Sequence, residues 1–139
     1  METLETEDIV HVLLHKAFHS LSYSAQLATK EKGRPLRKIK ITKSNGNVSA
    51  VGATWFARYS WLTGSITSNQ LYCWPCLLIN NGKSPTWAVH GFTDVKDIYR
   101  ATKRHDKCQV HVGAAMRHSL LGTMPIDQGL YSQSILSYR

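Results

Sequence analysis

Long apolar runs are missing from this sequence. No stretch of about 18 consecutive apolar residues occurs, and a membrane-spanning helix requires one. The N-terminus also lacks a basic segment that leads into an apolar one, because it opens with four acidic residues: Glu2, Glu5, Glu7 and Asp8. We therefore expect neither a membrane partner nor a secretory signal.

Cysteine is scarce, with 3 residues in a chain of 139, and two of them form the motif Cys73-x-x-Cys76. An odd number of cysteines with such a motif fits a metal site better than a disulfide framework. The sequence therefore predicts a reducing compartment, the nucleus or the cytosol.

Acidic residues are also few. The chain has 9 of them against 17 lysines and arginines, a net charge of +8 and a pI near 9.6. Such a charge attracts acidic partners, of which nucleic acid is the commonest and anionic membrane the usual rival. The carboxylates are too scattered for two-metal nuclease chemistry, and no Ser-His-Asp group or Gly-rich phosphate loop occurs. We predict no catalytic residues, no small-molecule substrate and no enzyme activity.

The length and the 42% hydrophobic content predict one modest domain with attached arms. We expect an α+β fold in which a β-knuckle packs on a C-terminal helix around zinc. Residues 1–49 form a helical leader and a basic arm, residues 50–122 form the zinc-stabilised domain, and residues 123–139 form a tail or the start of the next region.

Two helices are predicted in the leader. Apolar spacing favours one over residues 8–18, and residues 22–32 favour a second that ends at Gly33. His11, His15 and His19 stand four apart and can bind a metal in principle, but a solvated helix face is the favoured interpretation.

The basic arm covers residues 30–43, with one acid, Glu31, among seven basic residues: Lys30, Lys32, Arg34, Arg37, Lys38, Lys40 and Lys43. Lys38 and Lys40 alternate with isoleucines, which indicates an extended segment, and residues 44–47 read as a turn. Phosphate contact, a solvated surface and a nuclear import signal all remain open for this arm.

Aromatic residues gather between residues 50 and 63: Trp55, Phe56, Tyr59 and Trp61. Trp55 and Tyr59 are four apart and share one face of a helix, so a core role is favoured over a platform for stacking unpaired bases. Residues 64–69 are expected to form a loop.

The strongest motif is a set of four metal-ligating residues, Cys73, Cys76, His105 and His111. Two residues separate the cysteines, 28 separate Cys76 from His105, and five separate the histidines. Two thiolates and two imidazoles form a closed structural zinc site without an open position for catalysis, so we expect one Zn²⁺ ion. Residues 71–79 are predicted as two short β segments around a tight turn, followed by a surface loop at 80–85.

A last helix, capped by Thr93 or Asp94, is predicted to run through His105 and on toward Leu121. Positions six apart on an ideal helix point about 240° apart, so this helix must be distorted or must end between His105 and His111. Its cations, together with two of the arm, are the candidate DNA contacts: Lys38, Lys40, Lys96, Arg100, Lys103, Arg104 and Lys107.

Two alternatives to this metal site remain. Cys108 lies three residues from either histidine and can replace one of them, whereas His90 and His118 are lesser candidates. A thioredoxin-type redox pair at Cys73 and Cys76 requires a helix after a strand. The residues after Cys76 read instead as a strand and a turn, which disfavours a redox pair.

The pattern of these residues resembles the TTF-type, BED-like zinc finger of hAT-superfamily transposases and of transposase-derived, MYM-type zinc finger-like proteins. The resemblance covers roughly residues 8–121, with upstream similarity at residues 18–23 and 32–35. The matching residues of the finger are Trp55, Tyr59, Ser60, Trp61, Leu62, Leu71, Tyr72, Cys73, Trp74, Pro75, Cys76, Leu77, Leu78, Trp87, Gly91, Phe92, Thr93, Asp94, His105 and His111.

The resemblance implies a zinc-dependent module in the nucleus that binds double-stranded DNA, either transposon ends or host sites. The four ligands match the positions of the family, which usually has serine where this chain has Cys108. The catalytic region of the family is absent here, so we do not expect this chain to cut or join DNA. A protein-interaction module is the alternative, and an exposed Trp61 or Trp74 would favour it.

Overall fold

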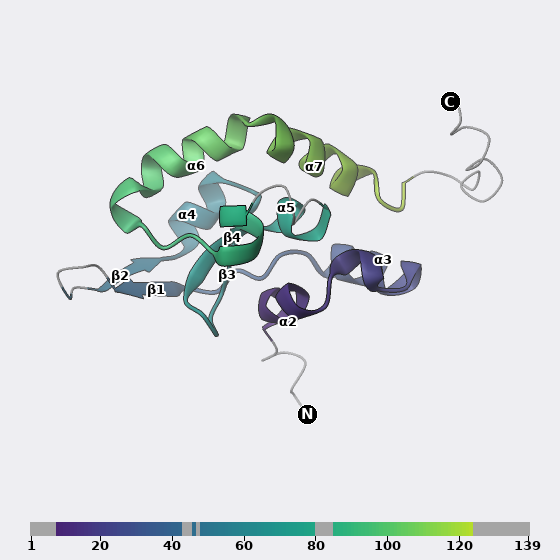
Figure 1. The fold of residues 1–139 in the computed structure, drawn as a ribbon, viewed down its shortest axis with the longest axis horizontal. Helices are drawn as coiled ribbons and strands as arrows, with labels where there is room; N and C mark the ends of the chain where they lie inside the picture. Colours follow the sequence, from purple (N-terminus) through teal and green to yellow (C-terminus); the bar gives the residue numbers. More distant parts are fainter. Residues whose placement is uncertain (1–7, 43–45, 47, 80–84, 124–139) are drawn as a thin grey trace.

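The structure is a computed structural model that describes residues 8–42, 46, 48–79 and 85–123. In this part of the chain, helices surround two small antiparallel hairpins, which confirms the expected α+β class (Figure 1). No helix in the described ranges has the length and apolar character needed to cross a membrane. The predicted turn at residues 44–47 lies almost entirely outside the described residues, as do Lys43, residues 80–84 and the tail from residue 124.

The first hairpin pairs strand β1 (Ile39–Thr42) with β2 (Val48–Val51), and Ile39 lies opposite Val51. Ile39, Ile41 and Val51 are buried, whereas Lys38 and Lys40 are exposed. The alternation in the arm therefore does produce an extended segment. The predicted boundary at residues 49/50 stays a prediction and falls within β2.

The second hairpin pairs β3 (Leu62–Ser65) with β4 (Gln70–Cys73). The expectation of a loop from residue 64 is wrong for Gly64 and Ser65, which belong to β3. Only residues 66–69 form the turn. A Cβ atom on Gly64 would lie 2.6 Å from Ile39 Cγ1, so glycine is needed where β3 passes closely over β1.

Two helices precede the hairpins. Helix α2 (Ile9–His15) is shorter than predicted, and the short 3-10 helix η1 (Phe18–Ser20) follows it. Helix α3 (Tyr23–Lys32) begins after Ser22, whose hydroxyl accepts a hydrogen bond from the Ala25 N–H, and ends at Gly33 with φ +83°. The second prediction for the leader is therefore confirmed, including its glycine end.

Asp8 connects α2 to the second hairpin. Its carboxylate accepts hydrogen bonds from His11 N–H at 3.2 Å, Ser65 Oγ at 2.7 Å and Thr67 N–H at 2.9 Å. Burial alone would raise the pKa of this carboxyl, but the hydrogen bonds from these three residues lower it by more. The pKa of Asp8 therefore lies below its ordinary value of 3.8. Asp8 is therefore ionised throughout the neutral and mildly acidic range.

Replacement of Asp8 by alanine is expected to lower the free energy of unfolding by about 2 kcal/mol, because the helix cap and the bonds to a charged acceptor disappear together. Because the pKa in the folded state lies below the ordinary value, this contribution is present above pH 3.8 and disappears only as the pH falls below it. Urea unfolding should therefore give the same loss at pH 7 and pH 5. Asp94→Ala, at an exposed position, is the matched control. A smaller loss of unfolding free energy for Asp8→Ala at pH 5 than at pH 7 would contradict the hydrogen bonds assigned to Asp8.

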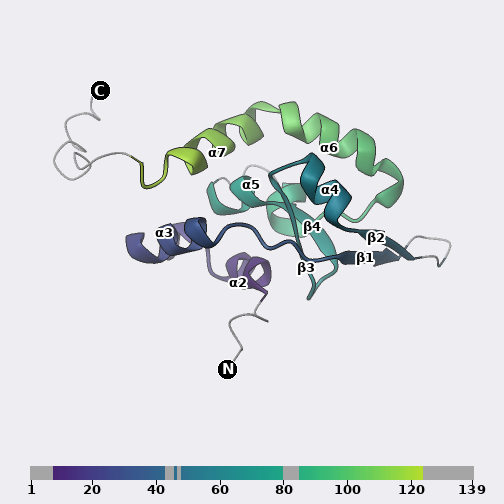
Figure 2. The same cartoon turned by 180° about the vertical axis from the view of Figure 1, so that it is seen from behind.

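The remaining helices are α4 (Ala53–Arg58), α5 (Trp74–Ile79), the π-helix η3 (Thr86–His90), the 3-10 helix η4 (Val95–Asp97), α6 (Ile98–Lys107) and α7 (Gln109–Leu120). The predicted caps at Thr93 and Asp94 are wrong, because α6 begins after η4 with Asp97 at its N-cap. Helices α6 and α7 form an arch over the hairpins, α4 and α5, and the opposite side holds α2 and α3 (Figures 1 and 2).

Two hydrophobic clusters fill the interior. The larger one joins the strands to α4, η3, α6 and α7 and includes Phe56, Trp61, Leu62, Leu71, Trp87, Phe92, Ile98 and Ala114. The smaller one joins α2 and η1 to β4 and α5 and contains Val10, Leu13, Phe18, Tyr72, Trp74, Leu77 and Leu78. Ile79 packs against both clusters, so α5 forms the wall between them.

Candidate metal centre

Four elements bring the predicted ligands together. Cys73 is the last residue of β4, Cys76 lies in α5, His105 lies in the last turn of α6, and His111 lies near the start of α7. The prediction of a second β segment after the cysteines is wrong, because residues 74–79 form helix α5. Both thiols still face the same point, because the chain turns from strand to helix between them.

The distances among the four ligand atoms fit a single metal ion. Cys73 Sγ lies 3.3 Å from His111 Nδ1, and Cys76 Sγ lies 3.5 Å from His105 Nε2. All four ligand atoms lie within 4.8 Å of one another. A tetrahedral zinc ion, with bonds of about 2.3 Å to sulfur and 2.0 Å to nitrogen, separates its ligands by about 3.5 Å. The cluster therefore has the dimensions of a metal site.

All four side chains are buried, with 0% exposure for both cysteines, 5% for His105 and 4% for His111. A hydrogen bond from Cys73 lowers the pKa of the Cys76 thiol to about 3, and the two imidazoles lower it as well. Burial, followed by the neighbouring Cys76, raises the pKa of Cys73. A divalent cation at this point would stabilise both cysteines as thiolates.

The spacing of the histidines is achieved by a break between two helices. Helix α6 ends at Lys107, and Cys108 is extended, with φ −75° and ψ 149°, before α7 begins at Gln109. Of the two arrangements expected for this segment, the ending of the helix is the one observed. The break turns His111 toward the same point as His105, which a continuous helix could not do.

Cys108 is not part of the cluster. Its sulfur is half-buried and lies 3.9 Å from Nδ1 of His105, whereas the Nε2 atom of the same ring faces Cys76. Cys108 therefore lies behind the ligand, where its sulfur can accept a hydrogen bond from His105 and hold the ring orientation. His90 and His118 also lie outside the four-residue cluster.

Aromatic side chains enclose the two imidazoles. The ring of Trp61 lies 4.8 Å from that of His105 and 5.2 Å from that of His111, measured between centroids. Its indole N–H donates a 2.8 Å hydrogen bond to Asp106, next to His105 in α6. The aromatic spacing indicated that Trp61 is in the core, but no sequence signal identified Asp106 as its partner.

The sheet topology, and not the residues after Cys76, disfavours a redox pair at Cys73 and Cys76. A helix does follow the strand that carries Cys73, so the earlier reason against a redox pair fails. The sheets of the described residues are antiparallel hairpins, however, and not the βαβ unit of thioredoxin-like proteins. Each thiol also faces a buried imidazole, as a metal ligand set requires.

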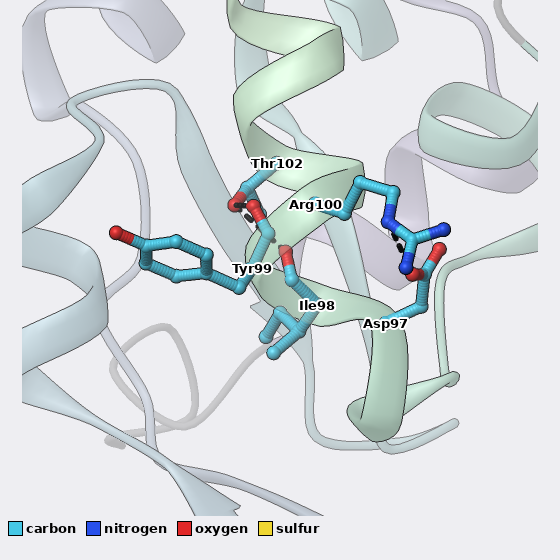
Figure 3. Close-up of polar contacts among 5 residues, drawn as sticks. All are labelled: Asp97, Ile98, Tyr99, Arg100 and Thr102. Atoms are coloured by element: carbon cyan, nitrogen blue, oxygen red, sulfur yellow. Dashed lines mark hydrogen bonds and ion pairs between the residues drawn. The ribbon is translucent and has the colours of Figure 1, made fainter.

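The candidate DNA-contacting residues all lie at the surface: Lys38, Lys40, Lys96, Arg100, Lys103, Arg104 and Lys107. On α6, the buried positions are Ile98, Ala101, Thr102 and His105. At 100° per residue, the four cations of α6 fall on the opposite side of the helix. Arg100 also forms a 3.4 Å exposed ion pair with Asp97, which contributes little at a surface (Figure 3).

Two cations of the arm have structural partners instead. Arg34 donates hydrogen bonds to the carbonyl oxygens of Leu62 at 2.6 Å and Phe56 at 3.0 Å. Lys30 lies in α3 and donates to the carbonyl oxygens of Ser119 and Leu121 at the end of α7. The basic run is therefore not one continuous arm, because part of its charge satisfies backbone carbonyls.

The tryptophans that would favour a protein-binding surface are buried, with 4% exposure for Trp61 and 3% for Trp74. Exposed aromatic surface occurs instead at Tyr99 and Tyr23, which are 58% and 52% exposed. Comparison of the chain with protein-family models, curated proteins and solved structures gives no match.

Proposed function

We propose that the chain is a zinc-dependent module that binds double-stranded DNA in the nucleus, as the resemblance to TTF-type fingers implies. Zinc is the metal expected for two thiolates and two imidazoles in a closed tetrahedral arrangement. Only the resemblance supports the kind of DNA site that the module recognises, which is either a transposon end or a host site.

One observation carries the proposal. Helix α6 supplies a metal ligand, His105, from its buried side and presents Arg100, Lys103, Arg104 and Lys107 on its opposite, exposed side. A metal at His105 would fix the helix against the hairpins, so its cations would face a partner at a constant spacing. Phosphate groups along a duplex suit such an array.

Helix α6 forms part of the arch over the hairpins (Figures 1 and 2), and its cations are exposed on the side opposite its buried residues. Lys38 directly precedes β1 and Lys40 lies in it, and both are exposed. They are the arm residues that we propose to contact the DNA backbone. The burial of Trp61 and Trp74 removes the feature on which a protein-binding alternative was based.

The double variant Arg100→Ala and Arg104→Ala is expected to weaken binding to a random-sequence duplex and to reduce the dependence of log K on log salt concentration by about two, because two phosphate contacts are lost. Fluorescence anisotropy with zinc-loaded protein measures both quantities. Lys16→Ala with Lys32→Ala is the matched control, because it removes the same charge from exposed positions at α2 and α3. Equal losses in the two double variants would show that only net charge matters and would refute the role of α6.

A further inference from the structure

Arg58 lies between two aromatic rings from different helices. It is the last residue of α4 and is exposed. Its guanidinium carbon lies 5.1 Å from the ring centroid of Trp55 and 5.2 Å from that of Tyr99. The two rings meet edge to face, with centroids 6.3 Å apart. This cluster connects α4 to the first turn of α6.

The aromatic contacts restrict the position of the guanidinium. A cation over a ring face is attracted by the ring electrons, and a planar guanidinium stacks there while its N–H groups stay at its edges. In the part of the chain that the structure describes, Arg58 forms no ion pair with a carboxylate. Its donors are therefore held at the surface and remain available to a ligand.

The cluster of Arg58, Trp55 and Tyr99 lies beside the N-terminal end of α6. Figure 3 shows Tyr99 and Arg100 projecting to opposite sides of this first turn. In helices that enter the major groove, residues near the N-terminus contact the edges of the bases. Arg58 therefore supplements α6 on its Tyr99 side with a cation from a second element.

We propose that Arg58 is a guanine-reading residue, which donates two hydrogen bonds to O6 and N7 of one guanine in the major groove. Arginine is suited to this contact because its N–H groups form a fixed fork that matches the two acceptors. Trp55 and Tyr99 are positioning residues that hold the fork before DNA binds. The proposal rests on the proposed function and adds a base contact to the phosphate contacts of α6.

The test is a selection from random duplex DNA with three zinc-loaded proteins: the unchanged chain, Arg58→Lys and Tyr99→Phe. The unchanged chain should enrich sites with one invariant guanine and should prefer that guanine over other bases by about tenfold to a hundredfold. Arg58→Lys keeps the charge but lacks the fork, so it should lose the preference at this position alone and keep its salt dependence. Tyr99→Phe keeps the ring and should select as the unchanged chain does.

Three results would overturn the inference. If Arg58→Lys keeps the guanine preference, or if it loses affinity equally for all sequences, Arg58 does not read a base while the module still binds DNA. If the unchanged chain enriches no sequence and binds no duplex, the proposed function fails and the inference fails with it. Far-ultraviolet circular dichroism and metal content verify that each variant is folded. In a fourth zinc-loaded protein, Tyr99→Ala, one of the two ring contacts of the guanidinium is lost and that of Trp55 remains, so the guanine preference should weaken less than in Arg58→Lys.

Discussion

Removal of the metal is expected to unfold this protein, and loss of one ligand should have the same result. A metal held by Cys73, Cys76, His105 and His111 would join β4, α5, α6 and α7 at a single point beside the larger hydrophobic cluster. Structural zinc contributes an apparent binding free energy of about 10–16 kcal/mol in small domains, which is comparable with the total stability of about 5–15 kcal/mol for a typical domain.

Cys76→Ala and His111→Ala test this expectation, together with a chelator added to the unchanged chain. We expect no bound metal, loss of the far-ultraviolet circular dichroism of the helices, and a fluorescence change from Trp61, whose ring contacts both imidazoles. Cys108→Ala is the control, because Cys108 lies behind His105 and not among the ligands. It should keep one metal ion per chain. A fully folded protein in excess chelator would refute the structural role of the metal.

Affinity for duplex DNA is expected to fall steeply as salt rises. Seven of the exposed cations are the candidate DNA contacts: Lys38, Lys40, Lys96, Arg100, Lys103, Arg104 and Lys107. If about five of them contact phosphates, log K should fall with log salt concentration at a slope of about −4.5, because each contact releases a condensed counterion. Between 50 and 200 mM salt, the affinity would then decrease by about 500-fold.

Anisotropy titrations at four or more salt concentrations give this slope for the zinc-loaded chain. The number of contacts follows from the slope, and the Arg100 and Arg104 double variant shows how many of them belong to α6. A salt-independent affinity would mean that the basic surface takes no part in binding. That outcome would leave the metal centre intact as a structural feature and remove the DNA-binding proposal.

The convergence of Cys73, Cys76, His105 and His111 could be predicted from the sequence, because their residue types and spacing suit four donors around one ion. The helix break followed from the same requirement, since His105 and His111 cannot share an ion on a straight helix. The helix at residues 74–79 could not be predicted, because a short apolar run has no period that distinguishes a buried strand from a buried helix. The burial of every residue from Trp74 to Leu78 shows why no polar side existed to reveal it.

Charge composition was a poorer guide than ligand spacing. Lys30 and Arg34 contribute to the same basic run as Lys38 and Lys40, yet they bond to backbone carbonyls of α7, α4 and β3. Their partners lie 22 to 91 positions away along the chain, so no local pattern identifies them. Arg58 was overlooked for the same reason, because Tyr99 is remote from it in sequence.

Helix α5 has one further consequence, which concerns cooperativity. One of its residues, Cys76, belongs to the cluster around the metal, and the next, Leu77, belongs to the cluster beneath α2. Helix α2 and the cluster around the metal-ligating residues therefore share the wall that α5 forms, and we expect them to unfold together. A fragment that starts at residue 50 would leave Tyr72, Trp74 and Leu77 facing water. Removal of the metal should abolish the slow amide exchange of α2, because α5 contacts both clusters.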